Sequence, residues 1–314
     1  MTSATKEIFE NHEIRKSKAQ RQRFREYIIS YARSLGYTAT EEKASKSAYN
    51  VIVGNPETAS VVYTAHYDTC AVMPMPNFIT PKCVPLYIIY QLFLTLIIYI
   101  IPISVMIGAR HVLDATSSDA LFSLTLLGGY AILILFSFLM IAGPANKHTA
   151  NDNTSGVTLI TEIMTDLPEE QRDKVAFIFF DLEELGMIGS KGYVARHKAL
   201  AGKMLLINFD CVSDGKTMLF VVKKKAADIV EKLEAAFKPS NTYSVDIVTR
   251  GAFYPSDQIN FRHGIGVAAM NKTKRGLLYM NRIHTPRDTV YDEENIKFLK
   301  SGAIEFAKLL VERG

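Results

Sequence analysis

Tryptophan is absent from this sequence of 314 residues, and cysteine is nearly so, with only Cys70, Cys83 and Cys211. No Cys-x-x-Cys pair occurs, which excludes a disulfide scaffold and a zinc knuckle made of thiolates. Neither sign of charge is in large excess, because the net charge is only +4, and no basic tract is interleaved with aromatic residues. We therefore expect no nucleic-acid partner. The polar stretch from Lys6 to Arg33 lacks the apolar run of a secretory signal, so we expect no such signal.

Two long runs contain no charged residue, residues 84–109 and residues 120–146. The ~30 Å apolar core of a bilayer needs about 20 residues in a helix, so each run is long enough to cross it. Pro102 and the Gly128-Gly129 pair would destabilise an exposed soluble helix but are tolerated in membrane helices. We therefore predict an inserted two-helix transmembrane hairpin over residues 84–143. Its spans are expected at about 84–108 and 120–143.

The alternative is a pair of buried helices in a soluble core, where two adjacent charge-free runs of this length are rare. Basic residues precede the first run and Lys147 follows the second, whereas the connecting segment holds only Arg110 apart from a histidine. The positive-inside rule then predicts a multi-pass cell-membrane protein with two spans, whose main domain is cytoplasmic. The basic residues before the first span include Arg15, Lys16, Lys18, Arg21, Arg23, Arg25 and Lys82.

Outside the hairpin, strand-like and helix-like segments alternate along the chain. This alternation predicts an α/β fold with a mixed, mainly parallel sheet and helices on both faces. We expect one discontinuous catalytic domain made of residues 1–83 and 144–314. The predicted strands are 49–53, 60–65, 175–180, 204–208, 218–222, 244–249 and 266–270, and the predicted helices are 13–35, 156–165, 226–237 and 293–312.

Histidines and carboxylates follow the predicted strands or lie in the loops between elements. Active sites of open α/β sheets lie beyond the carboxyl ends of the strands, so several of these groups should converge. Like charges gathered there need a cation, and imidazole with carboxylate but no thiolate suits zinc, with cobalt or manganese as substitutes. The residues concerned are His66, Asp68, Asp152, Glu183, Glu184, Asp210 and His284.

The order of these motifs resembles the co-catalytic dizinc aminopeptidase family, whose relatives include glutamate carboxypeptidase and glutaminyl cyclase. The resemblance covers the chain from about Val51 to the C-terminus, interrupted by the hairpin. It implies a zinc aminopeptidase-like fold, two Zn²⁺ per chain, and removal of the N-terminal residue from peptide substrates. A water held between two zinc ions should have a pKa near 7.

The resemblance also implies a role for each residue. Asp152 bridges the two metals and precedes a cis peptide bond to Asn153. Glu183 is the general base that takes a proton from water and returns it to the leaving amine. Asp68 orients one ligand histidine through its second ring nitrogen. The implied metal ligands pair His66 with Asp210 and Glu184 with His284.

The pocket is less well defined. Ser256, Asp257 and Gln258 resemble a Ser-Asp-His stretch near the family's substrate pocket, with Gln258 where histidine is common. These three residues are the candidates for substrate binding. The oligomeric state is left open by the sequence.

Rival interpretations are a single-zinc acyltransferase like glutaminyl cyclase and a catalytically inactive membrane scaffold. The cyclases line their pocket with tryptophan, which this chain lacks, and the scaffold would have lost ligands that are all present here. A carboxypeptidase or dipeptidase also stays open. Taken singly, Asp152 could belong to a helix N-cap region, Glu183-Glu184 to a solvated helix start and His284 to an ordinary loop.

The hairpin lies between Asp68 and Asp152 in the sequence, beside the predicted metal centre. We therefore hypothesise that the catalytic mouth faces the lipid bilayer and admits peptides that are hydrophobic or membrane-bound. The alternative is that the hairpin only tethers a general peptidase.

Overall fold

The computed structural model describes residues 1–73, 75–113 and 119–311. Within them, nine strands form one sheet in the order β1-β2-β4-β3-β5-β8-β6-β7, and β9 pairs with β8. The strands are β1 (Ala39–Lys43), β2 (Tyr49–Val53), β3 (Val61–His66), β4 (Val175–Phe180), β5 (Leu205–Phe209), β6 (Thr217–Val222), β7 (Ser244–Val248), β8 (His263–Lys272) and β9 (Leu278–Tyr279).

The centre of the sheet is parallel, as the sequence predicted. β3 pairs in parallel with β4 and β5, and β5 pairs in parallel with β8. Every residue of β3 and β4 is buried, which is typical of parallel strands covered on both faces. Antiparallel pairs (β1 with β2, β2 with β4, β6 with β8) make the sheet mixed. All seven predicted strands are present, with ends shifted by a few residues at most.

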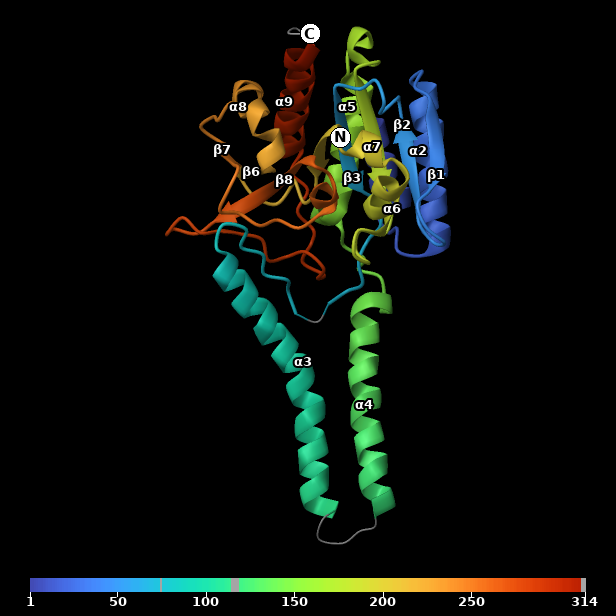
Figure 1. The fold of residues 1–314 in the computed structure, drawn as a ribbon, viewed down its shortest axis with the longest axis vertical. Helices are drawn as coiled ribbons and strands as arrows, with labels where there is room; N and C mark the ends of the chain where they lie inside the picture. Colours follow the sequence, from blue (N-terminus) through green and yellow to red (C-terminus); the bar gives the residue numbers. More distant parts are fainter. Residues whose placement is uncertain (74, 114–118, 312–314) are drawn as a thin grey trace.

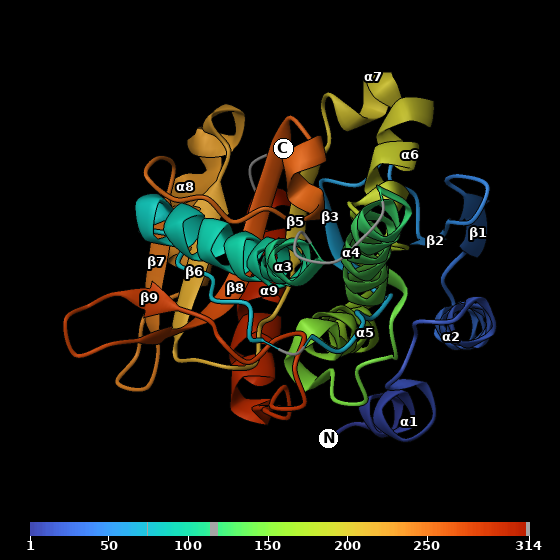
Figure 2. The same ribbon diagram turned by 90° about the horizontal axis from the view of Figure 1, so that it is seen from below.

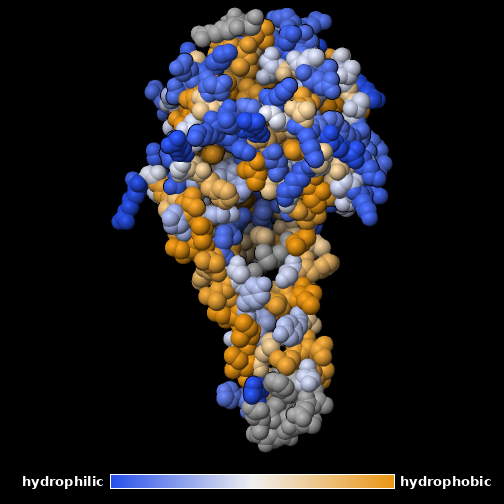
Figure 3. All heavy atoms as spheres, viewed as in Figure 1, coloured by the Kyte–Doolittle hydropathy of each residue, from blue (hydrophilic) through white to orange (hydrophobic). Residues whose placement is uncertain are grey.

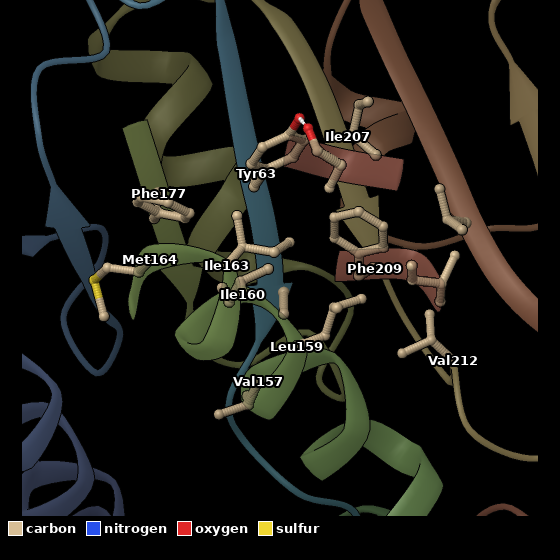
Figure 4. Close-up of a cluster of buried hydrophobic side chains, with 14 of the residues drawn as sticks. Tyr63, Val157, Leu159, Ile160, Ile163, Met164, Phe177, Ile207, Phe209 and Val212 are labelled. Carbon is tan, nitrogen blue, oxygen red and sulfur yellow. Dashed lines mark hydrogen bonds between the residues drawn. The ribbon is translucent and has the colours of Figure 1, made fainter. Parts of the chain in front are cut away.

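Helices cover both faces of the sheet (Figures 1 and 2). One face packs against α1, α2, α5 and α9, and the other packs against α6 and α7. In Figure 4, Leu159, Ile160 and Ile163 of α5 lie against Tyr63, Phe177 and Phe209 of the strands. Burial of each such side chain contributes about 1.5–3 kcal/mol. The helices are α1 (Ser3–His12), α2 (Lys18–Ser34), α5 (Gly156–Asp166), α6 (Ile188–Arg196), α7 (Lys198–Ala201), α8 (Val230–Ala236) and α9 (Glu293–Val311).

The N-terminal region differs from the single helix predicted over residues 13–35. Two helices occur instead, and α2 begins only at Lys18, after a capping box of Ser17 with Gln20. The preceding residue Arg15 is fully buried, and its guanidinium donates to the backbone carbonyls of Tyr67 and His12. The break in the helix lets this side chain turn inward.

Strand β1, helices α6 and α7 and the short β9 were not predicted. β1 has the sequence Ala-Thr-Glu-Glu-Lys and lies at the sheet edge, largely exposed, so it carries no apolar pattern. The helix predicted over residues 226–237 is a 3₁₀ segment (Lys224–Ile229) followed by α8.

The charge-free runs form two helices, α3 (Val84–Leu113) and α4 (Asp119–Ala142), which leave the same end of the domain (Figure 1). They diverge next to the domain and approach each other toward their far ends. Gly129 permits this approach, since a Cβ there would lie 2.4 Å from Met106 Cγ.

The surface of both helices is apolar (Figure 3). Leu92, Leu127 and Ile134 are 63%, 68% and 68% exposed. Within the described residues, one helix is long and apolar enough to cross a membrane, Val84–His111 with a mean hydropathy of 2.5, and Ser123–Leu139 is a shorter apolar stretch. Only 6% of this apolar stretch of α3 is buried, whereas the core helix of a soluble protein is mostly buried, which contradicts that alternative for α3.

Candidate metal centre

The residues predicted to hold metal come from five separate places in the chain. His66 ends β3, Glu184 lies in the loop after β4, and Asp210 directly follows β5. Asp152 lies in the π-helical turn η1 (Ala150–Ser155) that leads into α5, and His284 lies in the loop before α9. Because β3, β4 and β5 are parallel, three of the five side chains start from the same edge of the sheet.

All five predicted ligands converge around Asp152. One carboxylate oxygen, Asp152 Oδ1, lies 3.4 Å from His66 Nε2, which in turn is 3.5 Å from Asp210 Oδ1. The other oxygen, Asp152 Oδ2, lies 2.9 Å from His284 Nε2, and that nitrogen is 3.3 Å from Glu184 Oε2. The carboxylate of Asp152 therefore faces two separate sets of donors. These two sets contain the two pairs that the family resemblance implied.

The electrostatics of the cluster favour a bound cation. Burial alone would raise the pKa of Asp152, but hydrogen bonds with His284 and His66 hold it well below the usual range. Burial raises the pKa of Glu184 to about 8 against the opposing influence of His284. Burial also disfavours the imidazolium of His284, yet the neighbouring Glu184 and Asp152 raise its pKa to about 9. Protons are thus retained where several carboxylates crowd together, and a divalent cation would replace them.

Two buried carboxylate oxygens without hydrogen-bond partners show that these residues fit such a cation. Among the described residues, the buried oxygens Glu184 Oε1 and Asp210 Oδ1 accept no hydrogen bond. Donor atoms of His66, Asp152 and Glu184 all lie within 4.8 Å of one another. Imidazole nitrogen and carboxylate oxygen at this spacing are ligands that zinc accepts in proteins.

Asp68 contacts more than the histidine it was predicted to orient. Its Oδ1 is 3.5 Å from His66 Nδ1 and accepts the backbone N–H of Glu183 at 2.9 Å. Its Oδ2 accepts the backbone N–H of Glu184 at 3.2 Å. The nearer partner of His66 Nδ1 is the backbone carbonyl of Asp68, at 3.2 Å. Asp68 therefore orients the predicted ligand histidine mainly through its backbone, and its carboxylate holds the loop that carries the predicted base.

Glu183 itself is half-buried beside this cluster. Burial raises the pKa of its carboxyl well above the usual value, and the negative charges of Asp257, Asp210 and Glu184 raise it further, although His66 acts in the opposite direction. A carboxylate with a raised pKa is suited to accept a proton near neutral pH.

The backbone around the centre adopts unusual conformations. The Asp152–Asn153 peptide bond is cis, as the resemblance implied. Leu182, Cys211 and His284 have positive φ angles of 54°, 58° and 61°. Non-glycine residues in this left-handed region cluster at functional sites, where surrounding contacts impose the conformation.

Two positioning residues escaped the sequence reasoning. Asp288 accepts hydrogen bonds from the backbone N–H groups of Asn151 and Asp152, at 2.8 and 3.0 Å. The side chain of Asn153 accepts from the backbone N–H groups of Gly156 and Cys211. Asp288 lies in the same loop as His284, and no local sequence pattern points to its partners.

Two cysteines also lie at the centre. Cys211 could share a cation with Asp152 and Asp210, and Cys70 with Glu184 and His284, by distance alone. Burial raises the pKa of both thiols well above the usual value, and neighbouring carboxylates add to the effect, so both are neutral.

The candidate substrate residues lie beneath the centre and do not line its pocket. Ser256, Asp257 and Gln258 are all buried. The Gln258 amide donates to Tyr254 O at 2.7 Å and accepts from Asn208, and Tyr254 in turn donates to Asp210 O. Gln258 thus supports the segment that carries Asp210.

A pocket of about 190 Å³ opens beside Glu184 and His284. Drug-sized ligands occupy roughly 300–1,000 Å³, so this pocket suits a much smaller group, such as one residue. Its other lining residues are Lys16, Arg21, Asp68, Thr69, Cys70, Ala71, Met73, Ile141, Leu182 and Leu185.

Residues 137–306 match the family model of peptidase family M28, which covers more than half of the chain. The chain belongs to peptidase family M28. No curated protein matches it significantly. This M28 member is similar in structure to a Zn-dependent exopeptidase from Parabacteroides distasonis, with 16% identity and a TM-score of 0.60 over 97% of this chain and 94% of that one.

Two further solved structures are similar. Porphyromonas gingivalis glutaminyl cyclase has 15% identity and a TM-score of 0.59, over 98% of each chain. The Legionella pneumophila LapA aminopeptidase has 13% identity and a TM-score of 0.55, over 96% of this chain and 69% of that one. At such identities the likeness concerns the fold alone. The predicted family and the mixed α/β fold of zinc aminopeptidases are confirmed, and the family supports a zinc peptidase.

Proposed function

We propose that this M28 chain is a membrane-anchored aminopeptidase that uses two zinc ions to remove N-terminal residues from peptides. The observation that carries the proposal is the carboxylate of Asp152, whose two oxygens face two complete donor sets. His66 and Asp210 would hold one ion, and Glu184 and His284 would hold the other. Cobalt or manganese could substitute for zinc at such ligands.

The bound ions would supply Lewis acidity, polarising the scissile carbonyl and lowering the pKa of water. Glu183 would take a proton from that water and return it to the leaving amine. Asp68 would hold the Glu183 backbone at the distance that this transfer needs, through its 2.9 Å hydrogen bond. His66 would keep one tautomer because Asp68 faces its second ring nitrogen.

The size of the pocket supports an exopeptidase. A space of about 190 Å³ lies beside Glu184 and His284, which is of the size of one residue. One terminal residue would fill it, and the rest of the substrate would extend outward. Among the exopeptidases, we propose an aminopeptidase and not a carboxypeptidase or dipeptidase because the motifs resemble those of the dizinc aminopeptidases.

A second candidate function is the single-zinc acyl transfer of glutaminyl cyclases, since a cyclase is among the similar structures. Two observations favour the peptidase. Both donor sets around Asp152 are complete, and the sequence has no tryptophan to line a cyclase pocket. An inactive scaffold is disfavoured by the same complete set together with Glu183.

The hairpin would anchor the domain with two spans, α3 and α4. Their exposed side chains form an apolar surface far larger than a soluble monomer usually shows. Lys82 and Lys147 flank the two helices at the domain end, and Lys16 donates to Ile141 O at the end of α4. This supports a cytoplasmic catalytic domain, made of residues 1–83 and 144–314, in the cell membrane.

Three of the basic residues that precede the first span lie inside the folded domain. Arg15, Arg21 and Arg25 are buried in the domain, where Arg21 pairs with Asp181 at 2.8 Å and Arg25 pairs with Glu41. These three arginines stabilise the folded domain, so they do not indicate on which side of the membrane it lies. The orientation therefore relies on the lysines beside the helices.

The test uses purified full-length protein and a set of aminoacyl reporter substrates. We expect hydrolysis that a chelator abolishes and added zinc restores. Glu183→Gln should lower kcat by at least ~10²-fold, because glutamine cannot accept the proton, while metal content stays near the wild-type value. Glu169→Gln, on an exposed carboxylate of the 3₁₀ turn Glu169–Gln171, is the matched control and should leave both unchanged.

Turnover that resists the chelator would contradict the metal mechanism. Equal loss of activity and metal in Glu183→Gln would mean that Glu183 is a ligand and not the base. Release of a cyclised N-terminal product from a glutaminyl peptide, with no free amino acid, would favour the cyclase.

A further inference from the structure

The rim of the pocket is built in part from the hairpin. Ile141, the second-last residue of α4, lines it together with Met73, from the segment before α3, and Leu185. Ile141 is 58% exposed and Leu185 is 43% exposed. A pocket that contains two proposed metal ligands is thus lined in part by these three apolar side chains, which we call its apolar edge.

The segments that connect α3 and α4 to the domain pair with each other at this edge. Ala71 forms a β-bridge with Ala145, and Val72 N donates to Pro144 O at 2.9 Å. The backbone of Met73 donates to His284 O at 2.7 Å, which joins the same segment to a proposed ligand. The pocket and the base of the hairpin are therefore one structural unit.

The charge nearest to this edge already has a partner. Lys16 Nζ donates to Ile141 O at 2.8 Å, at the carbonyl end of α4 where a cation is favourable. The ammonium thus caps the helix, and the apolar side chains of the rim remain for contact with a substrate.

If α4 spans a bilayer, as proposed above, the rim would lie near the bilayer surface. α4 has 24 residues and is therefore about 36 Å long, close to the ~30 Å apolar core of a bilayer. Ile141, at its domain end, would stand at the boundary between lipid tails and headgroups. Figure 3 shows a hollow between the two arms just below the domain, flanked by hydrophobic side chains.

We propose that the pocket takes the N-terminal residue of peptides that are themselves held by the bilayer. The free amine and first residue would enter beside Glu184 and His284, and the following apolar residues would cross Ile141, Met73 and Leu185 toward the lipid. This inference rests on the proposed function and adds its substrate class. Confining enzyme and substrate to one surface raises their effective concentration, which favours such peptides without any new contact.

The test compares two reporter peptides with the same four N-terminal residues, using full-length protein in phosphatidylcholine vesicles. One peptide ends in a polar tail and stays soluble, and the other continues into an apolar segment of about 20 residues that enters the bilayer. We expect kcat/KM to be at least ~10-fold higher for the bilayer-held peptide, through a lower KM. Equal values would overturn the inference while leaving the proposed function in place. Failure to cleave either peptide would overturn both.

A pair of variants separates the rim from the anchor. Ile141→Ser should raise KM for the bilayer-held peptide by several-fold more than for the soluble peptide, with kcat little changed. Ile141→Leu keeps an apolar side chain at this position and should keep KM near the wild-type value. Ile134→Ser is the matched control, because Ile134 is 68% exposed on the same helix but does not line the pocket. An equal rise in KM for both variants would assign the effect to membrane insertion and contradict the role of the rim.

Discussion

Replacement of Asp68 by asparagine tests how the centre is held together. Asparagine has nearly the same shape but only one side-chain oxygen. That oxygen can accept from either Glu183 N or Glu184 N, which the aspartate now binds at 2.9 and 3.2 Å with separate oxygens. The other backbone N–H would then face an amide donor inside a buried region, since Asp68 is only 2% exposed.

The size of the effect follows from that lost acceptor. A buried donor without a partner costs about 1–3 kcal/mol, and each 1.4 kcal/mol is a factor of ten. We therefore expect Asp68→Asn to weaken zinc binding or lower kcat by about 10–100-fold, the range found when partners of metal ligands are changed. Zinc affinity is measured by competition with a chelator at pH 7.5, and kcat with the aminoacyl reporter.

Asp246→Asn is the control for this prediction. Its carboxylate pairs with Lys82 at 2.7 Å at the surface, and such pairs contribute about 0–1 kcal/mol. We expect zinc affinity and kcat within about twofold of wild type. If Asp68→Asn behaved like this control, Asp68 would not position the ligands and the base as argued.

Three other perturbations test the fold around the site. Ser17→Ala removes the capping box of α2 and should lower the free energy of unfolding by about 1 kcal/mol in urea titrations; no change would mean that the cap is not formed in solution. Gly156→Ala places a Cβ 2.3 Å from a backbone oxygen and should cost about 1–3 kcal/mol, whereas Gly128→Ala, with no atom within 4 Å, should not destabilise. Burial lowers the pKa of His12, so protonation of His12 opposes folding. The free energy of unfolding should therefore fall as the pH drops through 6.5 toward that lower pKa. His12→Phe should reduce this loss of stability, and an identical pH profile for the variant would refute the assignment.

The positions of the site residues could be predicted because polar side chains lie at the ends of the apolar strands or shortly after them. β3 and β4 are buried throughout, His66 is the last residue of β3, and Glu184 lies four residues after the end of β4. His66 and Glu184 were identified in this way. The parallel order of β4, β3 and β5 then brings them to Asp210.

Residues that act through backbone contacts could not be found from the sequence. Asp288 accepts hydrogen bonds from the backbone N–H groups of Asn151 and Asp152, which lie 137 and 136 positions away. From the sequence alone, Arg15 looks like one of many surface cations. In the structure it is buried, and its guanidinium donates to the backbone carbonyl of Tyr67. Such pairings depend on how distant segments pack, and no period or spacing records them.

The predicted role of the Ser256–Gln258 stretch illustrates the same limit. The resemblance implied a place near the substrate pocket, but these residues are buried and do not line the pocket beside Glu184 and His284, because the direction of each side chain depends on local packing. Gln258 lies under Gly266, where a Cβ would be 2.5 Å from Gln258 Nε2. Its amide therefore points into the core, toward Asn208 and the carbonyl of Tyr254.

The most direct test of the central claim is the metal content of the purified full-length protein. Elemental analysis after removal of weakly bound ions should give two zinc ions per chain, because the two oxygens of Asp152 face separate donor sets. A content of one ion per chain, or none that survives this treatment, would contradict the two-metal centre on which the proposed peptidase depends.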